Sequence, residues 1–197
     1  MNSAIRRSTS KLLALAAAGL AVVGVACGDL TAVPASLPTL TDSGSVYALN
    51  GAPPGAPTAL HVFSGSLLPA TSSFVFDVAF DLDAAGHVLI IPQRVVATGL
   101  SSTHSVGLQR ISVPFDSLTA APKTGYHADT TLVTGLGQVV AIQSSDPNAC
   151  SISLTGTTLY AKLVVVAADP VQKTLQVRFA VDPNCGFVSF APGLPKD

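Results

Sequence analysis

The histidines and aspartates of this sequence are the residue types that could carry acid–base chemistry. The densest polar group is Tyr126-His127-Ala128-Asp129. A Ser-His-Asp triad can assemble from residues far apart in the sequence, so a partner serine could come from elsewhere. The chain has no G-x-S-x-G nucleophile elbow and no Glu for an H-E-x-x-H zinc motif. We therefore treat Tyr126, His127 and Asp129 as weak candidates for a polar site, expect a solvated loop pair there, and predict no catalytic residues and no enzyme activity.

A second group of aspartates could suggest calcium binding or glycoside hydrolysis. Asp81, Asp83 and Gly86 match the opening of a calcium loop, but Ala85 stands at the third ligand position and Pro92 at the closing one. In a strand, Asp77 and Asp81 share one face about 13 Å apart, which is too far for a catalytic carboxylate pair. Asp81 and Asp83 are closer, but they would lie on an exposed face. We predict a solvated strand face followed by a turn, with no metal and no cofactor.

Two cysteines in the second half of the chain follow similar turns, Asp146-Pro147-Asn148-Ala149-Cys150 and Asp182-Pro183-Asn184-Cys185. In an oxidising compartment they most simply form a disulfide. On the chain-entropy model, closing a loop of this length stabilises the fold by about 4 kcal/mol. We expect Cys150 to begin a strand in which Ile152 and Leu154 point inward with it.

The N-terminus has the layout of a secretory signal. Arg6, Arg7 and Lys11 precede the uncharged apolar run Leu12–Val23. Because this run has 12 residues, against about 20 for a membrane-spanning helix, we predict a signal peptide over residues 1–26. Arg6-Arg7 also fits a twin-arginine signal, but general secretion is favoured because Thr9 and Ser10 stand where that signal has apolar residues.

Gly24-Val25-Ala26-Cys27 resembles the lipobox of bacterial lipoproteins, although Gly24 replaces the usual Leu, Val or Ile. The resemblance implies cleavage before Cys27 and lipidation of that cysteine. Ordinary cleavage after Ala26 is the alternative. Two or three acyl chains hold a protein firmly, since each buried CH₂ contributes about 0.8 kcal/mol. Gly28 follows where Asp often signals inner-membrane retention, so the outer membrane is mildly preferred.

The composition narrows the class of protein. After residue 26 the chain has seven basic and eleven acidic residues, a net charge of −4. This balance argues against nucleic-acid binding and leaves the N-terminal lipid as the predicted membrane contact. All eleven acidic residues are Asp, which favours turns over helices. Without Trp, and with three Tyr, the chain lacks the usual platform for sugars.

Alternating apolar residues with intervening turns predict one all-β domain, a sandwich or barrel of about ten short strands over residues 46–197. Residues 27–45 are expected to be the lipidated N-terminus and a flexible tether. The expected strands cover residues 74–83, 88–96, 106–113, 130–134, 138–143, 150–155, 159–165, 174–181 and 186–190, with short strands on either side of Gly51–Pro57.

The sequence thus predicts a lipid-anchored protein of the bacterial cell envelope, on the periplasmic or cell-surface side, with a non-catalytic structural or binding role. Its distal part, with Tyr160, the two Asp-Pro-Asn turns and Gly186-Phe187, resembles uncharacterised bacterial lipoproteins of no named family. Two alternatives stay open. One is an extracytoplasmic hydrolase that uses His127 and Asp129 with an unidentified serine. The other is an accessory subunit that binds an envelope protein partner.

Overall fold

The computed structural model describes residues 34–71, 75–97 and 104–195. The predicted signal peptide and the lipidation site at Cys27 lie outside these ranges. None of the helices formed by the described residues is long and apolar enough to cross a membrane.

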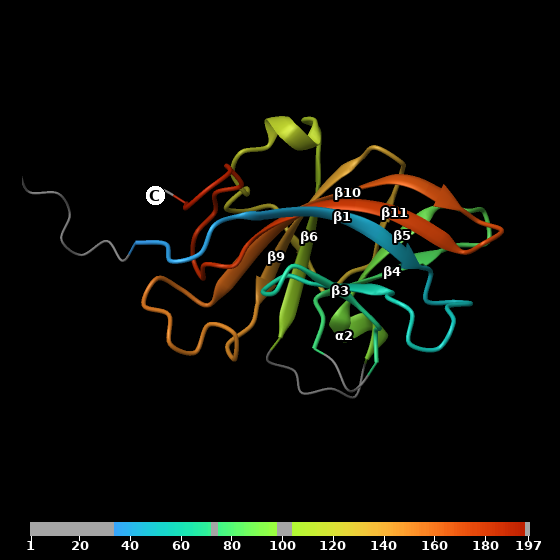
Figure 1. The fold of residues 1–197 in the computed structure, drawn as a ribbon, viewed down its shortest axis with the longest axis horizontal. Coiled ribbons are helices and arrows are strands. Elements are labelled where there is room, and N and C mark those ends of the chain that lie inside the picture. The colour runs from blue at the N-terminus through green and yellow to red at the C-terminus, as the bar shows by residue number, and fades with distance from the viewer. Residues whose placement is uncertain (1–33, 72–74, 98–103, 196–197) are drawn as a thin grey trace, which may run out of the picture. The chain divides into compact units, whose positions relative to one another are not determined.

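Two antiparallel sheets form the domain (Figure 1). The six-stranded sheet has the order β1-β11-β10-β9-β6-β7, and the five-stranded sheet has the order β3-β2-β4-β5-β8. The strands are β1 (Leu40–Tyr47), β2 (Ala59–His61), β3 (Ser66–Leu68), β4 (Val78–Leu82), β5 (Val88–Pro92), β6 (Ser105–Ile111), β7 (His127–Ala128), β8 (Leu132–Thr134), β9 (Val139–Ser145), β10 (Thr158–Asp169) and β11 (Thr174–Asp182). The helical elements described are α2 (Gln93–Val96) and the 3₁₀ helix η2 (Phe115–Ser117). The prediction of an all-β, sandwich-like domain is confirmed.

The main core lies between the two sheets and follows the alternation seen in the sequence. Leu163 of β10 and Phe179 of β11 are paired in register and fully buried, and Phe80 of β4 faces them from the other sheet. The other face of β10 is buried as well, because η2 and the segment after it cover Tyr160, Lys162 and Val164. Period-two alternation therefore identifies the strand, but not the second layer that covers it.

Strand β1 begins at Leu40 and pairs with β11 along its whole length, from Leu40 opposite Val181 to Tyr47 opposite Thr174. Residues 40–45 therefore belong to the sheet, although the sequence placed them in the tether. Their side chains are mostly exposed, because β1 is an edge strand. An edge strand with few buried side chains lacks the apolar alternation that predicts a strand.

Two expected strands, residues 150–155 and 186–190, are wrong, and a third is too long, because residues 88–92 form β5 as expected but residues 93–96 do not continue it. Residues 93–96 form α2, because Pro92 has no backbone N–H for the ladder and precedes the helix as its N-cap. Cys150–Thr155 form turns, because the Asp146 carboxylate accepts the backbone N–H groups of Asn148 and Ala149 and curls the chain. Gly186–Phe190 contributes a single bridge, from Ser189 to Ala120.

Candidate functional site

A buried polar cluster joins the two sheets. Asp77 directly precedes β4 in one sheet, His104 directly precedes β6 in the other, and Ser144 lies in β9 beside it. His104 Nε2 is 2.9 Å from Asp77 Oδ1 and 2.9 Å from Ser144 Oγ. The other Asp77 oxygen accepts the backbone N–H of Val62 at 2.5 Å. The carboxylate thus links the loop after β2 to His104 at the start of β6, and His104 extends the connection to Ser144 of β9.

The prediction that Asp77 lies on a solvated face is wrong, since its side chain is buried. The expected outer face of β4 is covered by a small apolar cluster that includes Phe76 and Ala79, with Leu49 and Val96 packed against it. The alternation of apolar and polar residues placed Asp77 on the correct strand face, but it could not show that this apolar cluster covers that face.

The geometry fixes one proton of His104. Nε2 must carry a hydrogen, because a bare imidazole nitrogen would not lie 2.9 Å from a carboxylate oxygen. Burial alone lowers the pKa of His104, but the hydrogen bond that His104 donates to Asp77 and the charges of Asp77, Asp146 and Asp129 outweigh it and raise the pKa above its ordinary value. Among the described residues, the buried Nδ1 has no hydrogen-bond partner.

These three residue types match a Ser-His-Asp triad, but their arrangement differs from one. A triad places the acid on Nδ1 and the serine on Nε2, so that the histidine can take the serine proton. Here both oxygens approach the same nitrogen, and the Ser144 side chain is fully buried. This arrangement suits a clamp between the sheets rather than a nucleophile and its base.

The residues of the polar group expected at 126–129 contact different parts of the structure. His127 is exposed in β7. The Asp129 carboxylate accepts hydrogen bonds from Arg94 Nη1 at 2.8 Å, Ser105 Oγ at 3.0 Å and the Val106 backbone N–H at 3.1 Å. Asp129 therefore binds the start of β6 and α2 instead of forming the solvated pair with His127 that the sequence suggested.

Tyr126 packs in a different cluster from this ion pair. Its ring centroid is 6.4 Å from that of Tyr160, and both belong to a cluster with Ala121 and Phe190. Burial raises the pKa of the Tyr126 phenol. The structure thus does not bring Tyr126, His127 and Asp129 together as one site.

The Asp81–Gly86 segment forms a turn held by its own carboxylates. Asp83 Oδ1 accepts the backbone N–H groups of Ala85 and His87, and Asp83 Oδ2 is 2.8 Å from His87 Nδ1. The side-chain hydrogen bond from His87 lowers the pKa of Asp83. Asp81 Oδ1 accepts the backbone N–H of Leu82. In the part of the chain that the structure describes, no three His, Cys, Asp or Glu side chains are grouped as metal ligands.

Lys162 is a buried cation that sequence reasoning missed. Its Nζ donates hydrogen bonds to the carbonyls of Phe115 at 2.7 Å and Leu118 at 2.8 Å, and it lies 4.3 Å from the centroid of the Phe115 ring. Burial lowers the pKa of Lys162. The side chain fastens η2 over β10, which is a structural role. Its position in an alternating strand gave no signal of burial.

The predicted disulfide is confirmed: Cys150 and Cys185 are bonded, with their Cα atoms 5.8 Å apart. It joins the turn after β9 to the segment after β11. Asn184, beside Cys185, accepts the backbone N–H groups of Ser36 and Leu37 at 2.9 and 3.0 Å. The disulfide and Asn184 together therefore connect three segments at the end of the sheet where β1 begins.

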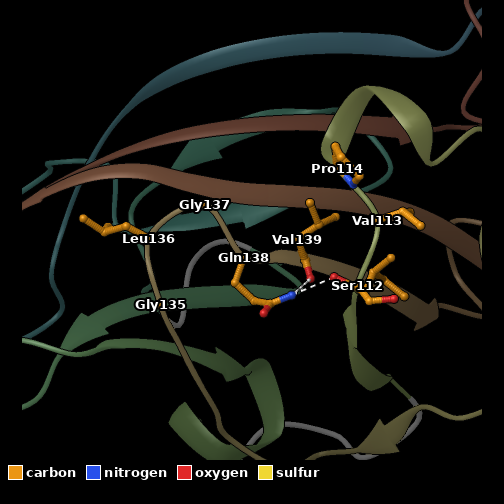
Figure 2. Close-up of a pocket in the computed structure, with 9 residues that line it drawn as sticks. Ser112, Val113, Pro114, Gly135, Leu136, Gly137, Gln138 and Val139 are labelled. Carbon is orange, nitrogen blue, oxygen red and sulfur yellow. Dashed lines mark hydrogen bonds between the residues drawn. The ribbon is translucent and has the colours of Figure 1, made fainter.

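A surface groove of about 660 Å³ lies between the loop after β6 and the turn before β9 (Figure 2). Gln138 crosses it and donates hydrogen bonds to the carbonyls of Ile111 at 2.6 Å and Val139 at 3.3 Å. Its nine lining residues are Ile111–Pro114 and Gly135–Val139, and none of them is ionisable. These walls offer apolar surface and backbone groups to a ligand, but no acid or base.

The fold and these clusters define an all-β, disulfide-bonded domain whose buried polar groups connect its layers. No protein-family model matches the chain, and no curated protein or solved structure is significantly similar to it.

Proposed function

We propose that this protein is an exported lipoprotein of the bacterial envelope, lipidated at Cys27, with a structural or binding role and no catalysis of its own. The observation that carries the proposal is the Cys150–Cys185 bond. Disulfides persist in oxidising compartments outside the cytoplasm. The bond uses two of the three cysteines and leaves Cys27, in its lipobox-like sequence, for the lipid.

The geometry of the polar clusters supports a non-catalytic role. The described Ser-His-Asp set is buried, with both oxygens on one histidine nitrogen. Asp129 is engaged by Arg94 and the start of β6. Each group has an evident task in holding elements of the fold together, and the carboxylate of Asp77 accounts for the raised pKa of His104.

Cell fractionation tests this proposal. Full-length protein expressed in a bacterium with lipoprotein-processing enzymes should appear in the membrane fraction, and it should be released only by detergent. Cys27→Ser removes the acceptor thiol, so that variant should be released as soluble protein or accumulate uncleaved. Cys150→Ser serves as the control, because it also removes a cysteine but leaves the lipobox intact. A Cys27→Ser protein that is cleaved and still retained in the membrane fraction as fully as the wild type would refute the proposal.

A further inference from the structure

Three segments at one end of the sandwich carry no charged residue. Segments 34–41, 147–159 and 183–195 contain no Asp, Glu, Lys or Arg, and they meet where β1 and β10 begin and β11 ends (Figure 1). We call this set of segments the uncharged end. Of the described acids that flank these segments, Asp146 and Asp182 are buried and Asp42 is exposed. Lys196 and Asp197 follow the third segment in the sequence and lie outside the described residues.

The three segments are fastened to one another. Cys150 of the second is bonded to Cys185 of the third, and the Thr155 hydroxyl donates to the Cys185 carbonyl. The first segment is held by Asn184 and by the Thr39 backbone N–H, which donates to the Gly193 carbonyl at 3.0 Å. The uncharged end is therefore a single structural unit.

The turn between Cys150 and Gly156 exposes two large apolar side chains. Ile152 is 93% exposed and Leu154 is 87% exposed. Leu37, Leu40 and Leu194, in the other two segments of the uncharged end, are also exposed. Large apolar side chains this exposed, on segments that are linked to one another, indicate a contact surface.

The opposite end of the sandwich is charged. Asp83 and His87 lie in the β4–β5 turn, while Asp169 and Lys173 bound the β10–β11 turn. These two turns meet, since a Cβ built on Gly86 would be 3.5 Å from Pro170. The sandwich is therefore polarised along its strands.

The uncharged end is also where the chain continues toward Cys27. Pro34 is seven residues after Cys27, and an extended chain of that length spans at most about 25 Å. Lipid attached to Cys27 would therefore keep this end of the domain close to the bilayer. Transfer of exposed Ile and Leu side chains into an apolar phase is favourable, whereas transfer of charged groups is costly.

We infer that the uncharged end rests on the lipid surface, with Ile152 and Leu154 inserted at the boundary between headgroups and acyl chains. The inference deepens the proposed function and rests on lipidation at Cys27. It gives the domain a fixed orientation, with the charged end directed away from the membrane.

Tryptophan fluorescence tests the inference, because the natural chain contains no Trp. Leu154→Trp places a reporter in the turn, and Val171→Trp is the matched control, since Val171 is 85% exposed in the β10–β11 turn. Each full-length protein is purified from membranes and reconstituted in phosphatidylethanolamine–phosphatidylglycerol vesicles, with and without acyl-brominated lipid. We expect the emission of the Leu154→Trp protein to move to shorter wavelength and to be quenched by brominated lipid. The emission of the Val171→Trp protein should do neither.

The outcomes distinguish failure of this inference from failure of the proposed lipidation at Cys27. The intact mass of each sample reports whether Cys27 is lipidated. A lipidated protein whose Leu154→Trp reporter is unquenched overturns the inference and leaves the proposed function standing. A protein without acyl chains overturns the proposed function, and quenching on added vesicles then decides the inference alone. A wavelength shift that follows protein concentration, and not lipid, would assign the turn to a second copy of the chain and overturn the inference.

Discussion

Two histidine–aspartate pairs of different burial allow a matched test of the clamp between the sheets. Asp77 and His104 have side chains 2% and 9% exposed, whereas those of Asp83 and His87 are 33% and 62% exposed. Asp77→Asn keeps the size of the side chain but replaces one acceptor oxygen with a donor. Because Asp77 accepts from both His104 and Val62, one of these buried donors must lose its partner.

The expected cost follows from those contacts. A hydrogen bond to a charged group contributes about 1.5–3 kcal/mol, and a buried donor left without a partner costs about 1–3 kcal/mol. Allowing for relaxation, Asp77→Asn should lower the free energy of unfolding by about 3 kcal/mol. In a domain of this size this corresponds to a fall in Tm of about 6–12 °C. Asp83→Asn keeps the turn's acceptor oxygen and should lower Tm far less.

The pH dependence gives a second reading of the same pair. The folded-state pKa of His104 is raised, so its contribution to stability is fully present below the unfolded pKa of about 6.5 and is lost as pH rises through the folded pKa. In Asp77→Asn, the carboxylate that raised the pKa of His104 is gone, so burial lowers this pKa. Protonation of the buried His104 then disfavours folding. The Tm difference between wild type and variant should therefore widen as pH falls from about 8 to about 5.5.

Thermal unfolding followed by circular dichroism across this pH range measures both effects, and histidine NMR titration reports the pKa of His104 directly. The clamp is refuted if Asp77→Asn and Asp83→Asn lower Tm equally. It is also refuted if the Tm difference narrows on acidification.

Other contacts give further expectations. The double variant Cys150→Ser/Cys185→Ser should lose about 4 kcal/mol of stability and about 8–16 °C in Tm, and chymotrypsin should then cut the C-terminal segment first; an unchanged proteolysis pattern would contradict this. Lys162→Met leaves two buried carbonyls without donors and should cost about 2–4 kcal/mol in urea unfolding; a neutral result would mean that η2 does not depend on the cation. His127→Ala should change stability by less than about 0.5 kcal/mol, whereas Asp129→Ala should cost about 1–2 kcal/mol; equal effects would contradict the assignment of Asp129 to Arg94 and β6.

The sequence predicts the strands that bury one apolar face in the core and leave the residues between them more polar. Leu163 and Phe179 alternate with neighbouring polar residues and lie in the core as expected. The paired Asp-Pro-Asn turns also identified the disulfide. Alternation failed at Ile152 and Leu154, which have the spacing of inward residues but lie on a turn closed by Asp146.

The candidate site was harder to predict, because it depends on contacts between distant segments. Asp77, His104 and Ser144 come from three separate parts of the chain, and the burial of Asp77 depends on residues such as Leu49 and Val96. The covering of Lys162 by η2 is a similar long-range packing event. In contrast, residues 126–129 were candidates because they are adjacent in the sequence, although their side chains contact different neighbours.

The intact mass of the mature protein tests the central claim most directly. Protein extracted from membranes with detergent should begin at Cys27 and exceed the mass of residues 27–197 by a diacylglyceryl group, with an amide-linked acyl chain where the host adds one. Alkylation without reduction should modify no cysteine, because Cys150 and Cys185 are bonded and Cys27 carries lipid. A mature chain that begins at Cys27 with a free, alkylatable thiol would contradict the account.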